Sequence, residues 1–139
     1  MASTTVYMAL DVGERRIGVA LADSQVAIAV PYDFIEVDGT ELEQLVKLAS
    51  FEKVNQLIVG YPRNQSGEPT AQTASVQAFT GKLMALLSIP MAYQDESVTS
   101  VQAEAHLKAT NKPYTKGDID SMAASIILQD YLEQHRGRV

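Results

Sequence analysis

The hydrophobic period of this sequence changes near residue 40, and this change restricts the fold more than any other feature. Before it, the apolar residues predict three strands, over residues 5–12, 16–23 and 27–37, the third bent near Pro31. Only three residues separate the first two strands. A connection that short is typical of a hairpin, so neighbouring strands in this part of the chain should be antiparallel.

Beyond residue 40, helical and strand patterns alternate. The further elements expected are a helix over 40–54, a strand over 56–60, a helix from Thr70, a strand over 89–94, a helix to about Ala109 capped by Ser97 or Thr99, and a helix over 116–136. The order βββαβαβαα predicts an α/β fold, a mixed five-stranded sheet of three antiparallel and then parallel strands with helices on both faces. We expect residues 1–139 to form one domain.

Composition excludes several classes of protein. The chain has no cysteine, so neither a disulfide framework nor a thiolate metal site can form. The N-terminal residues MASTTVY lack the basic start and the apolar core of a signal peptide. No apolar run approaches the ~18 residues of a membrane span. We therefore expect a cytoplasmic protein with no membrane partner.

Charge is unevenly distributed along this acidic chain. The formal net charge of -6, taken alone, argues against a broad electrostatic contact with nucleic acid. Local basic points could still provide such a contact. Residues 106–117 hold bases without acids, namely Lys108, Lys112 and Lys116, while Arg15 with Arg16 forms a second basic point and Arg63 a third.

Three acidic residues lie at unusual places on this predicted scaffold. Asp11 interrupts the first strand, which we expect to be central because it is the most apolar of the early three. Glu96, with Asp95 beside it, follows the fifth strand. Asp120 lies on the last helix, on a stripe with Ile127 that overlaps the core face, so its side chain should face the sheet.

Three carboxylates near one end of a sheet would repel each other, and burying such charges is costly. A divalent cation removes this penalty: Mg²⁺ takes oxygen ligands, and paired metals can bracket a phosphodiester undergoing displacement. Taken singly, each acid also has a plainer interpretation. Asp11 would be an end-of-strand residue, Asp120 or Asp118 a helix cap, and Asp95 and Glu96 a solvated loop.

Four sequence blocks together resemble the YqgF/RuvX family, a bacterial group with a ribonuclease H-like fold that is related to Holliday-junction resolvases. The blocks are ALDVGERRIGVALAD, LIVGYPRNQSGEPTAQTASVQAF, YQDESVTSVQAEAHL and KGDIDSMAASIILQDYL. The resemblance extends from about residue 5 to residue 135, and the order and spacing of the blocks all fit the family.

This resemblance implies a metal-dependent nuclease that acts in maturation of the 5′ end of pre-16S ribosomal RNA. Carried over position by position, the catalytic acids are Asp11, Glu96 and Asp120, the three residues singled out above. The same three acids would be the ligands of Mg²⁺ or Mn²⁺. The implied partners are nucleic acid, as pre-rRNA or branched DNA, and ribosomal assembly intermediates.

Two positions depart from the family's pattern. Ser97 stands where the family usually has an arginine, and Ser66 stands where it usually has an acid. Neither position is one of the three acids, so the departures bear on substrate preference more than on chemistry.

Four basic residues are expected to hold the phosphates that flank the cleaved bond, in salt-sensitive contacts. They are Arg15, Arg16, Lys112 and Lys116. For each of them, an ordinary solvated surface is the alternative. Asp95 could assist the acids through a hydrogen bond.

Other functions stay open at this point. The first block also resembles the phosphate-binding strand pair of the actin, Hsp70 and sugar-kinase group, but that group needs two such domains around ATP, and 139 residues supply only one. The fold could instead serve ribosome assembly as a non-catalytic RNA- or protein-binding module. A Holliday junction resolvase would need two copies acting on two strands, so both a monomer and a homodimer are open.

Overall fold

The computed structural model describes residues 4–62, 68–96 and 99–135. Three strands come first and strands then alternate with helices, so the predicted order of elements is confirmed. The strands are β1 (Val6–Val12), β2 (Arg16–Asp23), β3 (Val30–Glu36), β4 (Gln56–Pro62) and β5 (Met91–Glu96). The helices are α1 (Glu41–Phe51), α2 (Ala71–Met84), α3 (Thr99–Ala109) and α4 (Lys116–Gln134).

The strands form one mixed sheet in the order β3-β2-β1-β4-β5. β2 pairs antiparallel with both β1 and β3, whereas β4 pairs parallel with both β1 and β5. β1 lies in the middle, as predicted for the most apolar of the early strands. Met8, Ala9 and Leu10 of this strand are fully buried, which is typical of a strand covered on both faces.

The third strand is shorter than predicted. It begins at Val30 rather than at residue 27, because Ala27 has a positive φ of 57° that an extended strand does not allow. The pairing of β2 with β3 also shifts register at the step from Val19 to Ala20. The predicted bend near Pro31 is therefore an irregularity in strand pairing of the β-bulge kind.

The fifth strand continues further than predicted. β5 ends at Glu96, which is level with Pro62 of the parallel strand β4. Glu96 is thus the last residue of the strand and not a residue beyond it. The difference matters because alternation along a strand then fixes the face to which each side chain points.

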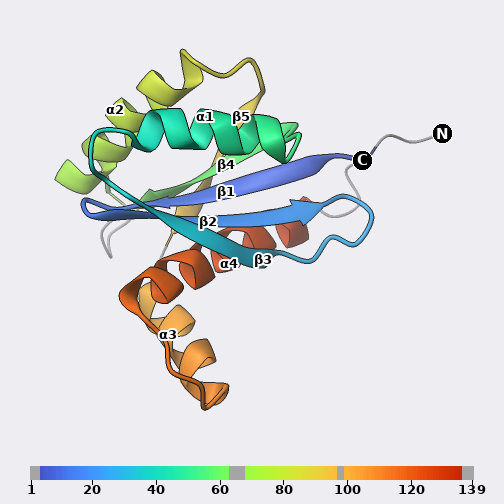
Figure 1. Ribbon diagram of the computed structural model, residues 1–139, viewed down its shortest axis with the longest axis vertical. Coiled ribbons are helices and arrows are strands. Elements are labelled where there is room, and N and C mark those ends of the chain that lie inside the picture. Colours follow the sequence, from blue (N-terminus) through green and yellow to red (C-terminus); the bar gives the residue numbers. More distant parts are fainter. Residues whose placement is uncertain (1–3, 63–67, 97–98, 136–139) are drawn as a thin grey trace.

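Helices cover both faces of this sheet (Figure 1). α1 and α2 lie on one face, and α4 crosses the other with α3 packed against it. The core between the sheet and the first pair of helices includes Leu10, Val19, Leu45, Val59 and Leu83. The core under α4 includes Ala9, Ile58, Ala124, Ile127 and Leu128. Among the helices of the described ranges, none combines the length and the apolar character needed to cross a membrane.

Small residues let α4 approach the sheet closely at its N-terminal end. A Cβ atom at Gly117 would lie 2.2 Å from Cε1 of Phe34 on β3, so the helix begins directly on that ring. A Cβ atom at Gly18 would lie 1.9 Å from the backbone oxygen of Asp120. Here the backbone of the helix rests on the backbone of β2, and any side chain at position 18 would separate them.

Candidate active site

Asp11 lies in the sheet between two glycines. Its partner on the antiparallel strand β2 is Gly18. On the other side, the parallel register of β1 and β4 continues to place Gly60 beside it. Both glycines face α4, because a Cβ atom at either position would contact that helix. The sheet therefore presents one carboxylate in a row whose neighbours have no side chains.

Glu96 reaches Asp11 across Gly60. A Cβ atom at position 60 would lie 2.9 Å from Oε2 of Glu96 and 2.7 Å from Cδ1 of Ile127. This glycine leaves the space through which a carboxylate from β5 passes over β4 towards β1. The carboxyl groups of Asp11 and Glu96 hydrogen-bond each other. This contact between two carboxyl groups favours the protonated form of Asp11.

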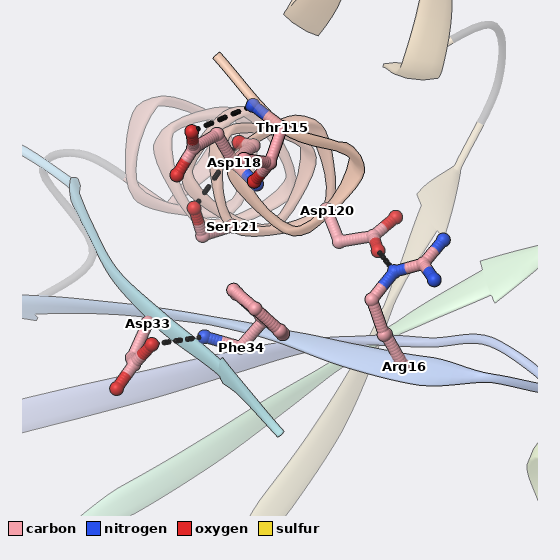
Figure 2. A network of polar contacts seen from close by, with 7 residues as sticks. All are labelled: Arg16, Asp33, Phe34, Thr115, Asp118, Asp120 and Ser121. Atoms are coloured by element: carbon pink, nitrogen blue, oxygen red, sulfur yellow. Dashed lines mark hydrogen bonds and ion pairs between the residues drawn. The ribbon is translucent and has the colours of Figure 1, made fainter. Parts of the chain in front are cut away.

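Asp120 enters the same region from α4, above Gly18. Its Oδ2 atom lies 2.6 Å from Nε of Arg16, which donates a hydrogen bond and forms an ion pair with it (Figure 2). The two side chains are 24% and 23% exposed, so this ion pair is partly shielded from water. The side chain of Asp120 faces the sheet, as the helical stripe predicts, and its carboxylate is engaged by a residue of β2.

The surroundings of Asp11 hold its pKa well above the ordinary value of an aspartate. Burial, which takes water from the charged form, is the main cause. The negative charge of Glu96 and its hydrogen bond raise the pKa further, and the charge of Asp120 adds to this effect. Two acids from distant parts of the chain, Glu96 and Asp120, thus both act electrostatically on Asp11.

The chemistry of these acids fits a hard divalent cation, while their geometry brings two carboxylates together rather than three. Carboxylate oxygens are the ligands that Mg²⁺ and Mn²⁺ prefer. Across residues 4–62, 68–96 and 99–135, no three His, Cys, Asp or Glu side chains form a group that could hold a metal ion. Asp11 and Glu96 form a pair, and Arg16 holds the third carboxylate. A site of three ligands requires the carboxylate of Asp120 to move towards this pair.

The basic residues expected to hold phosphates lie in different surroundings. Arg15, in the turn between β1 and β2, is exposed to solvent. Lys112, between α3 and α4, and Lys116, the first residue of α4, are exposed as well. Arg16 differs because its guanidinium is already paired with Asp120.

Asp118 caps α4, which confirms the plainer interpretation of this acid. Its Oδ2 accepts a hydrogen bond from the backbone N–H of Thr115 at 2.8 Å, and the hydroxyl of Thr115 accepts one from the N–H of Asp118 at 3.2 Å (Figure 2). Asp95 is exposed on β5. The basic residue Arg63 and the two departures from the family pattern, Ser66 and Ser97, lie outside the described residues.

Two features of the site escaped the sequence analysis. The sequence did not reveal that Gly18 and Gly60 leave room beside Asp11. Pairing the first two predicted strands as a hairpin does bring Gly18 towards that residue. The ion pair of Arg16 with Asp120 joins residues 104 positions apart. It depends on how α4 packs on the sheet, and no local pattern indicates it.

Comparison with known proteins gives a consistent result. The sequence pattern of a family described as "RuvX: Holliday junction resolvase" matches residues 5–134. A protein of Chloroflexus aurantiacus is 44% identical over 135 residues, which cover 94% of this chain and 88% of that protein. A protein of Crocosphaera subtropica is 41% identical over 133 residues, covering 93% of each chain. Both are named "Putative pre-16S rRNA nuclease".

Two solved structures are similar in fold at low sequence identity. The RuvC of T. thermophilus, in complex with a Holliday junction substrate, has a TM-score of 0.61 and 13% identity, covering 96% of each chain. The Fowlpox virus resolvase, in complex with Holliday junction DNA, has a TM-score of 0.59 and 11% identity, covering 95% of this chain and 99% of that one. At such identities the likeness concerns the fold alone, and it confirms the predicted ribonuclease H-like architecture.

Proposed function

This chain belongs to the RuvX family, and on that premise we propose that it is a metal-dependent nuclease that matures the 5′ end of pre-16S ribosomal RNA. The observation that carries the proposal is the contact of Asp11 with Glu96 over Gly60, with Asp120 acting on them from α4. Neighbouring carboxylates that repel each other are groups that a divalent cation stabilises. An rRNA precursor as substrate places the protein with ribosomal assembly intermediates in the cytoplasm.

In this proposal Asp11, Glu96 and Asp120 hold Mg²⁺ or Mn²⁺. The ion, when bound, acts as a Lewis acid on the phosphodiester and makes water a better nucleophile at neutral pH. The chain's own contribution is to gather the oxygens. Gly60 gives Glu96 its path, and Gly18 lets the helix bring Asp120 near. A carboxyl group must lose its proton to act as a ligand, so the raised pKa of Asp11 would make the binding of the ion depend on pH.

Arg16 has a part in the proposal that differs from that of the other bases. Without a cation, it neutralises Asp120 and holds that carboxylate on β2. Once released, its guanidinium can bind a substrate phosphate beside the acids. Arg15, Lys112 and Lys116 would hold phosphates further along the strand, as positioning contacts.

A cleavage assay tests the nuclease proposal. We expect the wild type to cleave a labelled pre-16S rRNA precursor when Mn²⁺ is present, and the purified Asp11→Asn variant to keep its fold and lose the activity. Asp130→Asn, the same substitution at an exposed position of α4, is the matched control and should cleave like the wild type. Equal cleavage by the wild type and Asp11→Asn would mean that the activity belongs to a contaminant.

The ion pair of Arg16 with Asp120 favours a second candidate function. If that pair is permanent, the acids are structural and the protein is a non-catalytic RNA- or protein-binding module of ribosome assembly. Calorimetric titration with Mn²⁺ separates the two functions. Binding that is lost in Asp120→Asn supports the nuclease, and the absence of binding by the wild type supports the module.

The same cleavage assay distinguishes the substrates of a nuclease. A four-way DNA junction is tested beside the rRNA precursor, because the family description names junction resolution. Preferred cleavage of the junction by a homodimer would assign the protein to resolvases, since a junction requires cuts in two strands.

A further inference from the structure

Exposed apolar side chains gather at the β3 edge of the sheet, where they line a pocket of about 470 Å³. The most exposed of them are Val26, Ile28, Val30 and Tyr32, which are 63%, 60%, 57% and 44% exposed. They come from the connection between β2 and β3 and from the start of β3. A group of this kind, which we call the edge patch, is typical of a surface that contacts another molecule.

The connection between β2 and β3 is held in place from two sides. The carboxylate of Asp23 accepts a hydrogen bond from the backbone N–H of Val26 at 2.8 Å. The side-chain amide of Gln129, on α4, accepts one from the N–H of Ala29 at 2.8 Å and donates one to the carbonyl oxygen of Ala27 at 3.4 Å. A surface that is ordered before it meets a partner loses little conformational entropy on binding. The edge patch is thus a preorganised surface.

The backbone of β3 is a poor template for the addition of another strand. Pro31 has no N–H group, and the N–H of Phe34 donates a hydrogen bond to the side chain of its neighbour Asp33 at 2.8 Å. The register between β2 and β3 also leaves Tyr32 out of the strand pairing, as in a β-bulge. These features protect an edge strand from pairing with another chain. A partner therefore has to bind the edge patch through side chains.

Two acids line the same pocket. Asp23 ends β2, and Glu52 follows α1 and accepts a hydrogen bond from the hydroxyl of Tyr32 at 2.9 Å. Within residues 4–62, 68–96 and 99–135, neither carboxylate forms an ion pair, and no lysine or arginine lines the pocket. A purely apolar partner would take water from these two charges without replacing it, which is costly. A partner that carries lysine or arginine beside its apolar side chains avoids this cost.

The same charges make two other partners poor ones. A second copy of this chain would bring its own Asp23 and Glu52 to the contact, and each copy carries a net charge of -6. Like charges that meet across an interface oppose association. The phosphates of a nucleic acid would be repelled by the same two acids.

We propose that the edge patch binds a basic protein segment, with apolar side chains seated on Ile28 and Val30 and a lysine or arginine beside Glu52. The inference goes beyond the proposed nuclease function and does not depend on it. The edge patch lies where β1 begins, and Asp11 lies near the end of that strand, so the two are at opposite ends of the sheet (Figure 1). A partner on the edge patch therefore leaves the acids open to a substrate.

Two fluorescently labelled peptides serve as probes of the edge patch. One alternates leucine with lysine, and the other has glutamate in place of every lysine. We expect the wild type to bind the lysine peptide and to bind the glutamate peptide about tenfold more weakly, because the acids favour one charge and repel the other. Equal affinities for the two peptides would overturn the inference.

Ile28→Ser tests the apolar part of the contact. It should bind the lysine peptide about tenfold more weakly than the wild type, because the burial of an aliphatic side chain contributes about that much. Leu86→Ser is the matched control. Leu86 is 56% exposed in the connection between α2 and β5, outside the edge patch, and its replacement should leave the affinity unchanged.

Glu52→Gln tests the charge. Glutamine keeps an oxygen that can accept the hydrogen bond of Tyr32 and removes one negative charge. The affinity for the lysine peptide should fall about threefold at low salt, and this difference should shrink as salt rises. Glu43→Gln, at an exposed position of α1, makes the same change in net charge and should bind like the wild type.

Three results would show that the edge patch has another role. If the lysine peptide does not bind, or if Ile28→Ser binds it no more weakly than Leu86→Ser, the patch does not hold such a segment. A wild type that sediments as a dimer, and that Ile28→Ser dissociates, would assign the patch to a second copy of this chain. Weaker binding of a labelled single-stranded RNA octamer by Ile28→Ser would assign it to nucleic acid. None of these measurements uses cleavage, so the inference and the nuclease proposal are tested separately.

Discussion

At the scale of single residues, Asp11 opposes folding when no cation is present. Its pKa is raised in the folded protein, chiefly by burial and then by Glu96 and Asp120. A carboxyl group of this kind binds its proton more tightly in the folded than in the unfolded state. Its favourable contribution is complete below the unfolded pKa of about 3.9 and is lost as the pH rises through the folded pKa.

Asp11→Asn should therefore stabilise the metal-free protein at neutral pH. We expect a higher Tm than that of the wild type in EDTA at pH 8, and a smaller difference as the pH is lowered towards 4.5. Thermal unfolding across this pH range measures the effect. Addition of Mn²⁺ should reverse the order, because an ion that binds only the folded wild type stabilises it by mass action. A wild type that is the more stable protein in EDTA at pH 8 would contradict this account of Asp11.

Gly60→Ala tests the path of Glu96 to Asp11. The added Cβ meets the ends of two side chains, Oε2 of Glu96 at 2.9 Å and Cδ1 of Ile127 at 2.7 Å, and both can move. We expect a loss of about 1–3 kcal/mol in the free energy of unfolding, as for other overpacked sites. Calorimetry should also show weaker binding of Mn²⁺, because the carboxylate is pushed from its partner.

Gly81→Ala is the control for this substitution. Gly81 lies on α2, and a Cβ atom there has nothing within 4 Å. Alanine should therefore stabilise the helix by about 1 kcal/mol, the difference in helix propensity, and leave Mn²⁺ binding unchanged. Urea denaturation of both variants measures the contrast. Weaker Mn²⁺ binding by Gly81→Ala would show that the effect at position 60 is not local.

At the scale of elements, the packing of α4 on β2 positions the third acid. Gly18→Ala would place a Cβ atom 1.9 Å from the backbone oxygen and 2.3 Å from the backbone carbon of Asp120. Backbone atoms of a helix cannot move singly, so the whole N-terminal end of α4 must shift. We expect a loss above the ~1–3 kcal/mol usual for overpacking, and hence a larger loss than in Gly60→Ala. Urea denaturation ranks the two variants, and the reverse order would mean that α4 is not held against β2 at this glycine.

Element order was predictable from the sequence because its signals are local. The short apolar runs of β1 and β2 and the recurrence of Ala124 and Ile127 along α4 are such local signals. The ends of elements were less accurate. β5 continues to Glu96 because it pairs with β4. A local sequence pattern does not indicate how far two strands that are distant in the sequence pair with each other.

The candidate site was only partly predictable for the same reason. Helical phase placed Asp120 towards the sheet, and the structure has it there. The partner of its carboxylate, Arg16, was instead assigned to phosphate, because nothing near either residue in sequence indicates an ion pair between β2 and α4. The assignment of the three acids to catalysis stays a prediction for the cleavage assay.

At the scale of the whole molecule, this acidic protein can bind a nucleic acid only where basic residues lie together on its surface. The net charge of -6 repels phosphates at long range. Lys112 and Lys116 are exposed at the turn that joins α3 to α4, where residues 110–115 include no acid. α1, whose first turn carries Glu41 and Glu43, lies on the opposite face of the sheet (Figure 1). The substrate should therefore approach the face covered by α4.

This uneven distribution of charge over the two faces predicts how salt weakens the binding of a nucleic acid. Each lysine that neutralises one phosphate of a single strand contributes about −0.7 to the slope of log affinity against log salt concentration. In titrations with a fluorescently labelled single-stranded RNA octamer, Lys112→Gln should therefore make this slope shallower by about 0.7. Lys47→Gln is the control, because Lys47 is exposed on α1, and it should leave the slope unchanged.

The loss of affinity in Lys112→Gln should itself depend on salt. It should be largest at low salt concentration and shrink as salt rises, because the release of counterions favours binding less when salt is abundant. A slope that changes equally in Lys112→Gln and Lys47→Gln would mean that the strand does not follow the α4 face.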